Sequence, residues 1–300
     1  MGLLLAGATL WVGHLHRVDW NGMCQAVGDM PHEALMWAEV FTVVSYLVYS
    51  SIDLLARRVT GHRIGARRVL IIGFVSHACA LNLGPAGAGF RFRLYMTHGL
   101  DAGTSAAIWL FNIATNWIGF VLIAGAAFTS QTMKLPLSWG MASHASQFIG
   151  VVLLGLVGGY LAACAMAHGR AWRIFDRDVT LPTVGIALLQ CLVSSLNWGL
   201  LAWVLTMLLQ HRVDAASVLA ALMTSALALA IIDVPAGLGV TETVFLAMLG
   251  AQVPGNELLA AMLAYRAIYY LAPLLVALPV YLALEFDIGT HRARRVARHG

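Results

Sequence analysis

Long runs of hydrophobic residues dominate the chain and are separated by short polar or basic segments. Runs of about 20 apolar residues are long enough to cross the ~30 Å hydrocarbon core of a bilayer as α-helices. Apolar blocks lie near residues 2–16, 33–55, 69–83, 104–128, 145–167, 181–209, 215–232, 240–250 and 257–284. This pattern predicts an all-α polytopic membrane protein.

The first block differs from the others in length. Its apolar residues end at His14, His16 and Arg17, and about 15 residues reach only ~22 Å along a helix axis. We therefore expect a spanning helix whose natural beginning precedes Met1. The mixed segment 18–32 that follows predicts an interfacial helix or a loop.

Two later runs are interrupted by the same motif, proline-alanine-glycine-x-glycine. The copies begin half a chain of 300 residues apart, and their prolines and glycines are Pro85, Gly87, Gly89, Pro235, Gly237 and Gly239. Glycine permits a break in a helix and the close approach of a neighbouring helix. Paired interruptions at matching places in two halves of a hydrophobic chain are typical of a transporter binding site. We predict a helix break within each motif.

Arginines indicate the orientation in the membrane. They gather in the loop at 56–68, in the loop at 168–180 and in the tail at 285–300. The positive-inside rule places such segments in the cytoplasm. We therefore predict a multi-pass protein of the cytoplasmic membrane with both termini in the cytoplasm.

The number of crossings then constrains the first half of the chain. Between the cytoplasmic loops at 56–68 and 168–180 the chain must cross an even number of times, but three apolar blocks intervene. The count becomes even if segment 69–98 enters from the cytoplasm, breaks, and returns to the same side. This segment is therefore predicted to be a re-entrant helical hairpin.

The second half gives the complementary result. Helix 181–209 runs outward and helix 257–284 runs inward, so segment 215–253 must enter and leave from outside. The sequence thus predicts about six spanning helices plus two oppositely directed re-entrant hairpins. These form one transmembrane domain of two inverted repeats, about 33–167 and about 181–284. Irregular backbone at membrane depth needs protein or water as a partner, so we expect the hairpins to face a central, partly wet cleft.

Two arginines follow the first break. Arg91 and Arg93 lie where a new helix would begin, and helix starts and guanidinium groups both attract phosphate. The alternative is that both side chains extend to the cytoplasmic headgroups and only fix the topology.

Further charges accompany the second break. Glu242 lies in the first turn after it, and we expect a pairing with an arginine rather than a purely local cap, because a lone carboxylate at depth is costly. Arg266 lies about ten residues into the final helix, with Tyr269 on its face. Arg266 is a candidate for substrate binding or for a structural ion pair between helices.

Polar residues form a stripe on each of two further helices. The stripes are Asn112, Thr115 and Asn116, and Gln190, Ser194 and Asn197. Each covers one helix face and could line a polar cavity, with Asn116 and Asn197 as substrate contacts. Hydrogen bonding between helices is an equally good interpretation.

Composition removes several classes of function. The chain is 60% hydrophobic and 11% charged, with a net charge of +4 and a mean hydropathy of +0.80. No basic face carries interleaved aromatics, which excludes nucleic-acid binding. The histidines show no metal-ligand spacing, and no nucleotide-binding or catalytic motif is present, so the sequence predicts no cofactor and no metal. His77, inside the first hairpin, is interpreted as a satisfied core histidine.

The motifs PAGLGVTETVFLAML and LAYRAIYYLAPLLVALPVYL, with GFRFRLYMTHGL, carry a resemblance. The chain is similar to bacterial YbhN-type inner-membrane proteins, which group with the membrane-embedded, flippase-like region of lysylphosphatidylglycerol synthases of the MprF type. This resemblance implies movement of lipids between leaflets, with Arg91, Arg93, Glu242 and Arg266 around the lipid path. The synthase half is not part of this chain, so aminoacyl transfer is not implied.

The leading hypothesis is a bacterial inner-membrane lipid translocase that acts on a phospholipid or a modified phospholipid and is not an enzyme. One alternative is a membrane-embedded lipid-modifying enzyme that uses Glu242 and a histidine as acid and base. Another is a non-catalytic scaffold of envelope machinery. The expected partner is membrane phospholipid, and a homodimer or an envelope-protein partner stays open.

Overall fold

The computed structural model describes most of the chain between residue 25 and residue 296. The described residues are Gln25, 28–131, 143–167, 171–174, 177–232, 237 and 239–296. Block 2–16, most of segment 18–32 and Pro235 lie outside them. The predictions for these residues therefore stay predictions.

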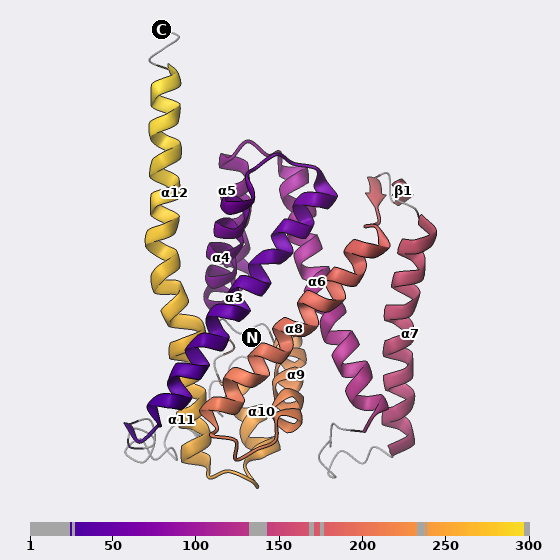
Figure 1. Cartoon of the computed structure of the whole chain (residues 1–300), viewed down its shortest axis with the longest axis vertical. Helices are drawn as coiled ribbons and strands as arrows, with labels where there is room; N and C mark the ends of the chain where they lie inside the picture. Colours follow the sequence, from indigo (N-terminus) through magenta and orange to yellow (C-terminus); the bar gives the residue numbers. More distant parts are fainter. Residues whose placement is uncertain are drawn as a thin grey trace.

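Within the described part the fold is helical apart from one short antiparallel strand pair. The elements are α3 (His32–Thr60), α4 (Ala66–Leu83), α5 (Pro85–Thr97), α6 (Ala102–Thr129), α7 (Ser143–Ala167), β1 (Ala171–Ile174), β2 (Arg177–Thr180), α8 (Val184–Leu208), α9 (Ala215–Ile232), α10 (Val240–Leu249), α11 (Gly255–Tyr265), the π-helical segment η3 (Arg266–Leu271) and α12 (Ala272–Val296). The last three form one nearly continuous rod (Figure 1).

Six of the described helices are long and apolar enough to cross a membrane. They are His32–Thr60, Ala66–Leu83, Ala102–Thr129, His144–Ala167, Val184–Leu208 and Gly255–Phe286. Large apolar side chains such as Phe148, Leu156 and Met166 on α7 are exposed on the outside of the bundle, as expected where lipid is the solvent. The all-α polytopic membrane class is confirmed.

The first hairpin is made by α4 and α5, which pack against each other along their lengths. The break lies at Gly84, with φ 56°, a conformation that costs little only for glycine. Pro85 begins α5, where its missing N–H loses no hydrogen bond. Gly87 sits against α4, and a Cβ there would lie 2.6 Å from the carbonyl oxygen of Cys79.

The predicted position of this break was therefore wrong by a small margin. Gly87 and Gly89 lie inside α5 and not in the break. Proline starts a helix more readily than it interrupts one when a glycine precedes it, and this moves the break to Gly84. No atom would obstruct a Cβ at Gly89 within 4 Å.

The second hairpin is made by α9 and α10, which also pack together. Here the glycines of the motif do form the break, because Gly237 has φ 64° and Gly239 has φ 82°. Figure 1 shows α4 and α5 in the upper half of the molecule and α9 and α10 in the lower half. The two hairpins thus start from opposite ends of the bundle.

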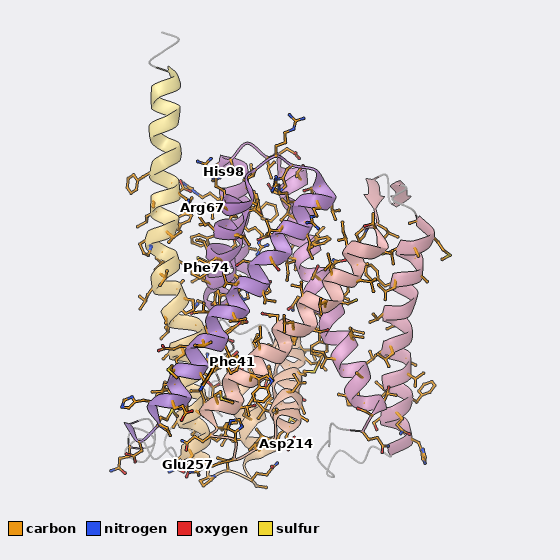
Figure 2. The ribbon with its side chains drawn as sticks, viewed as in Figure 1. Phe41, Arg67, Phe74, His98, Asp214 and Glu257 are labelled. Carbon is orange, nitrogen blue, oxygen red and sulfur yellow. The ribbon has the colours of Figure 1, made fainter. Side chains whose placement is uncertain are left out.

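Labelled side chains near the open end of each hairpin show that the two hairpins start at opposite ends of the bundle. Figure 2 shows Arg67, at the start of α4, and His98, directly after α5, toward one end of the bundle. Asp214, directly before α9, lies at the other end. The opposite directions match the sequence prediction, while insertion into a membrane from opposite faces stays a prediction.

Aspartates cap α6, which follows the first hairpin, and α9, which is the first arm of the second, in the same way. Asp101 accepts hydrogen bonds from the N–H and the hydroxyl of Thr104, at 2.9 and 2.6 Å, and so caps α6. Asp214 accepts from the N–H and hydroxyl of Ser217, at 2.9 and 2.7 Å, at the start of α9. The hydroxyl bond, followed by the N–H bond, lowers the pKa of each carboxyl group. These caps fix where each helix begins.

Candidate functional site

An ion pair connects the break between α9 and α10 with the segment η3. Arg266 donates from Nε to Oε1 of Glu242 at 2.6 Å, and from Nη2 to the carbonyl oxygen of Gly237 at 3.1 Å. Glu242 also accepts the backbone N–H of Gly239 at 2.9 Å. The expected pairing of Glu242 with an arginine is present, together with the local cap. The two side chains are 15% and 21% exposed, so the pair is partly accessible.

Arg266 begins the π-helical segment η3. A π turn inserts an extra residue into a helix, loosens its hydrogen-bond ladder and occurs frequently at functional sites. Two side chains stabilise the carbonyl groups of this turn: the Tyr46 hydroxyl donates to the Tyr269 carbonyl at 2.9 Å, and Asn82 Nδ2 donates to the Tyr270 carbonyl at 3.1 Å. Helices α3 and α4 therefore hold the irregular turn in place.

The side chain of Tyr269 belongs to a buried hydrogen-bond chain. Its hydroxyl lies 2.9 Å from the Ser45 hydroxyl, and Ser45 donates to Oδ1 of Asn197 at 2.8 Å. This chain joins η3, α3 and α8 at the centre of the bundle. In this conformation Tyr269 and Asn197 connect helices and are closed to solvent.

Arg91 is buried in a second ion pair. Its Nη1 donates to Oδ1 of Asp53 on α3 at 2.6 Å, and Asn112 Nδ2 donates to the same oxygen at 2.7 Å. The side chains of Arg91 and Asp53 are 6% and 0% exposed. Gly73 makes room for the carboxylate, since a Cβ there would lie 2.6 Å from Oδ2. The pair connects α5, α3 and α6.

Several polar atoms in these buried helices have no hydrogen-bond partner among the described residues. They include Oδ2 of Asp53, Oδ1 of Asn112, the hydroxyl of Tyr95 and Nε2 of His77. His77 stacks on Tyr49, with ring centroids 3.5 Å apart. The histidine is buried as expected, but ring stacking holds it while its Nε2 lacks a hydrogen bond.

Arg93 points away from this buried pair. Its Nε and Nη2 donate to the two carboxylate oxygens of Glu285 on α12, at 2.6 and 3.1 Å. Tyr281 donates to Glu285 Oε1 at 3.1 Å. Because the Arg93 side chain is 63% exposed, it lies within reach of groups outside the protein.

The two polar stripes meet each other. Gln190 Nε2 donates to the Thr115 hydroxyl at 2.6 Å, and Ser194 and Trp198 donate to the Asn116 carbonyl oxygen at 3.1 and 3.2 Å. At these positions the structure favours hydrogen bonding between α6 and α8 over the lining of a cavity. The half-buried Asn116 contributes its backbone to these bonds.

Comparisons with known proteins identify the family. Residues 1–277 match the family model described as the lysylphosphatidylglycerol synthase TM region. The chain belongs to this family. It is 38% identical over 296 residues to the inner membrane protein YbhN of Escherichia coli, and the aligned region covers 98% of this chain and 93% of that protein. It is also 27% identical over 292 residues to the uncharacterized protein slr0712 of Synechocystis, and here the aligned region covers 95% of this chain and 89% of that protein.

For this member of the lysylphosphatidylglycerol synthase TM region family, the structure adds two carboxylates that the sequence analysis missed. Asp53 lies near the end of the apolar block 33–55, which also holds Glu33 and Glu39 near its start, and a carboxylate within a predicted spanning helix was the available signal. Glu285 was assigned to the tail, and nothing in the sequence connects it with Arg93. In the described part of the chain no three histidine, cysteine or acidic side chains gather where they could hold a metal ion.

Proposed function

We propose that the protein moves phospholipids between the two leaflets of a bacterial inner membrane. Membership of the lysylphosphatidylglycerol synthase TM region family and the similarity to an inner membrane protein support a lipid-related role. The family model is named for a synthase of a modified phospholipid, and the transported lipid is proposed to be a phospholipid or a modified one.

The observation that carries the proposal is the Glu242–Arg266 pair at a broken helix. Arg266 is partly exposed and lies in a π turn, whose backbone is loosened. Its guanidinium can therefore exchange one anionic partner for another. A lipid phosphate that approaches Arg266 can replace the carboxylate of Glu242. The guanidinium then keeps an anionic partner throughout, which avoids the cost of an uncompensated charge at depth.

The short second arm of each hairpin supports re-entrant insertion, although the first arms α4 and α9 have 18 residues each. Helix α5 has 13 residues and α10 has 10, which gives about 20 Å and about 15 Å at 1.5 Å per residue, less than the ~30 Å of the hydrocarbon core. We propose that the hairpins enter from opposite faces and that rocking of one repeat against the other alternates access to Arg266.

The arginines of the first hairpin have different parts in this mechanism. Arg93 is exposed, and its bidentate contact with Glu285 can be exchanged for a headgroup phosphate at the end of α5. Arg91 is buried in its ion pair with Asp53. It can contact a lipid only in a conformation where α5 has moved away from α3.

Transport without covalent chemistry is the preferred form of the proposal. The carboxylate of Glu242 contacts Arg266 and the N–H of Gly239, and no histidine of the described residues hydrogen-bonds to it. An acid–base pair would need such a contact, directly or through one water. Unchanged lipid masses after incubation with the protein are expected from transport, whereas a new lipid species would favour the enzyme.

Leaflet exchange in liposomes tests the proposal. Purified protein is reconstituted with fluorescent phospholipids of several headgroups, and the fraction quenched by a membrane-impermeant reductant is followed over time. We expect that the fluorescent lipids of the inner leaflet become accessible to the reductant only in protein-containing vesicles. Rates equal to those of empty vesicles for every headgroup, with folded protein in the membrane, would reject translocation.

A further inference from the structure

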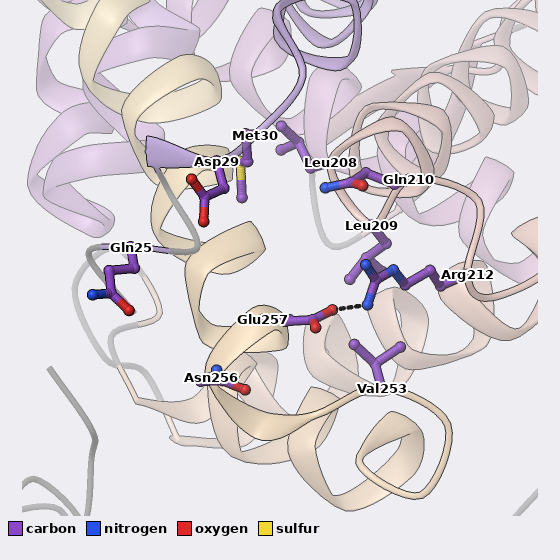
Figure 3. A pocket seen from close by; sticks show the side chains of 10 residues that line it. All are labelled: Gln25, Asp29, Met30, Leu208, Leu209, Gln210, Arg212, Val253, Asn256 and Glu257. Carbon is purple, nitrogen blue, oxygen red and sulfur yellow. Dashed lines mark hydrogen bonds and ion pairs between the residues drawn. The ribbon is translucent and has the colours of Figure 1, made fainter. Parts of the chain in front are cut away.

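A pocket of about 310 Å³ opens at the end of the bundle where α3 begins, α8 ends and α11 begins (Figure 3). Its apolar wall includes the buried side chains of Met30, Leu209 and Val253. Small-molecule sites span about 300–1,000 Å³, so the pocket has room for a polar headgroup but not for acyl chains. Neither member of the Glu242–Arg266 pair lines it.

Charged side chains surround the opening of this pocket. Arg212, after α8, forms an ion pair with Glu257 on α11, and both remain partly exposed. Asp29 lies across the opening in Figure 3, is exposed, and forms no ion pair with a described residue. The described lining therefore has two carboxylates and one guanidinium, and Gln25, Gln210 and Asn256 add amide groups.

This combination suits a ligand with one anionic and one cationic group. The guanidinium of Arg212 matches a phosphate in geometry. Helix α11 begins beside it without a side-chain cap, so its first N–H groups and its dipole also favour an anion. The carboxylates of Asp29 and Glu257 match an ammonium group, and a primary ammonium offers three hydrogen-bond donors where a quaternary one offers none.

We propose that this pocket binds the headgroup of a phospholipid that carries both a phosphate and a primary ammonium group. Its position at the ends of three spanning helices places it at the level of lipid headgroups. Its role in transport rests on the proposed translocation, and it makes amine-bearing phospholipids the favoured cargo. The binding itself does not depend on translocation.

Native mass spectrometry of the intact protein tests the binding. The protein is taken from nanodiscs with equal amounts of phosphatidylethanolamine, phosphatidylcholine and phosphatidylglycerol, and the retained lipids are counted. We expect phosphatidylethanolamine to dominate. In the double variant Asp29→Asn with Glu257→Gln, we expect its preference over phosphatidylglycerol to fall about tenfold, the size of a lost charge-assisted hydrogen bond.

Two further variants control this test. Glu33→Gln removes an exposed carboxylate from the first turn of α3 that does not line the pocket, and it should leave the preference unchanged. Asp29→Asn alone keeps the Arg212–Glu257 ion pair, and a reduced preference in this variant is compared at a Tm equal to that of the wild type, which separates lost binding from misfolding. Equal retention of the three lipids by the wild type, or an unchanged preference in the double variant, would overturn the proposal.

Leaflet exchange with the same variants separates the two proposals. A loss of headgroup preference with continued exchange supports the pocket and leaves translocation intact. Preferential binding of phosphatidylethanolamine by a protein that exchanges no lipid would remove translocation and retain the site. Exchange of all headgroups at equal rates by the wild type would contradict the role of the pocket in choosing the cargo.

Discussion

Replacing Arg91 with methionine is expected to destabilise the protein by about 3–5 kcal/mol, because it leaves the carboxylate of Asp53 buried without its cation. For a domain of this size, such a loss lowers the Tm by about 10 °C. Thermal unfolding in detergent, followed by tryptophan fluorescence, measures the change. This is the largest effect on stability that we expect from a single substitution in the described part of the chain.

A double-mutant cycle identifies the cause of this loss. Arg91→Met combined with Asp53→Asn removes both charges, and the asparagine can still accept the hydrogen bond from Asn112. We expect the double variant to recover most of the stability, because neutral replacements of a buried ion pair cost little. A single Arg91→Met variant as stable as the wild type would show that the ion pair does not form in the membrane.

The second large effect concerns transport. Arg266→Gln is expected to slow leaflet exchange at least about tenfold, since it removes the charge-assisted bonds proposed to hold the lipid phosphate. The same substitution leaves Glu242 without its cation, so the amount of folded protein must be measured alongside the rate. Exchange rates per folded molecule are compared in proteoliposomes of matched protein content.

A neutral pair distinguishes a phosphate site from a structural ion pair. Arg266→Gln with Glu242→Gln removes both charges and restores an uncharged contact at the break. A purely structural role predicts that exchange returns together with stability. Phosphate binding by Arg266 predicts restored stability and slow exchange. Glu242→Gln alone keeps the arginine, and we expect tighter lipid binding there because the competing carboxylate is gone.

The sequence predicted the features that follow from local chemistry and from counting crossings. Apolar length predicted five of the six helices that are long enough to span, whereas the sixth, α4, was assigned to the first hairpin. The paired motifs predicted the two hairpins, and the count of crossings predicted their opposite directions. The first break lies at Gly84 and not within Pro85–Gly89, because proline is compatible with the first turn of α5. That choice depends on the conformation of one glycine, which the motif does not specify.

The partners of the charged residues could not be obtained in this way. Arg91 and Asp53 are far apart in sequence, and only the packing of α5 and of α3 against the shared neighbours α4 and α6 brings their side chains together. The π turn at Arg266 has no sequence signature, since it depends on Tyr46 and Asn82 from two other helices. Helix lengths are local properties, whereas these contacts are set by the assembled bundle.

Labelling of single cysteines from the two sides of the membrane tests the opposed hairpins most directly. In a chain whose four cysteines are replaced by alanine, Gly65→Cys and Thr97→Cys flank the α4–α5 hairpin, and Ala215→Cys and Ala251→Cys flank the α9–α10 hairpin. We predict that an impermeant thiol reagent reaches the first two only from the cytoplasm and the last two only from outside. Labelling of the two members of either pair from opposite sides would mean that the segment crosses the membrane, and would contradict the re-entrant arrangement.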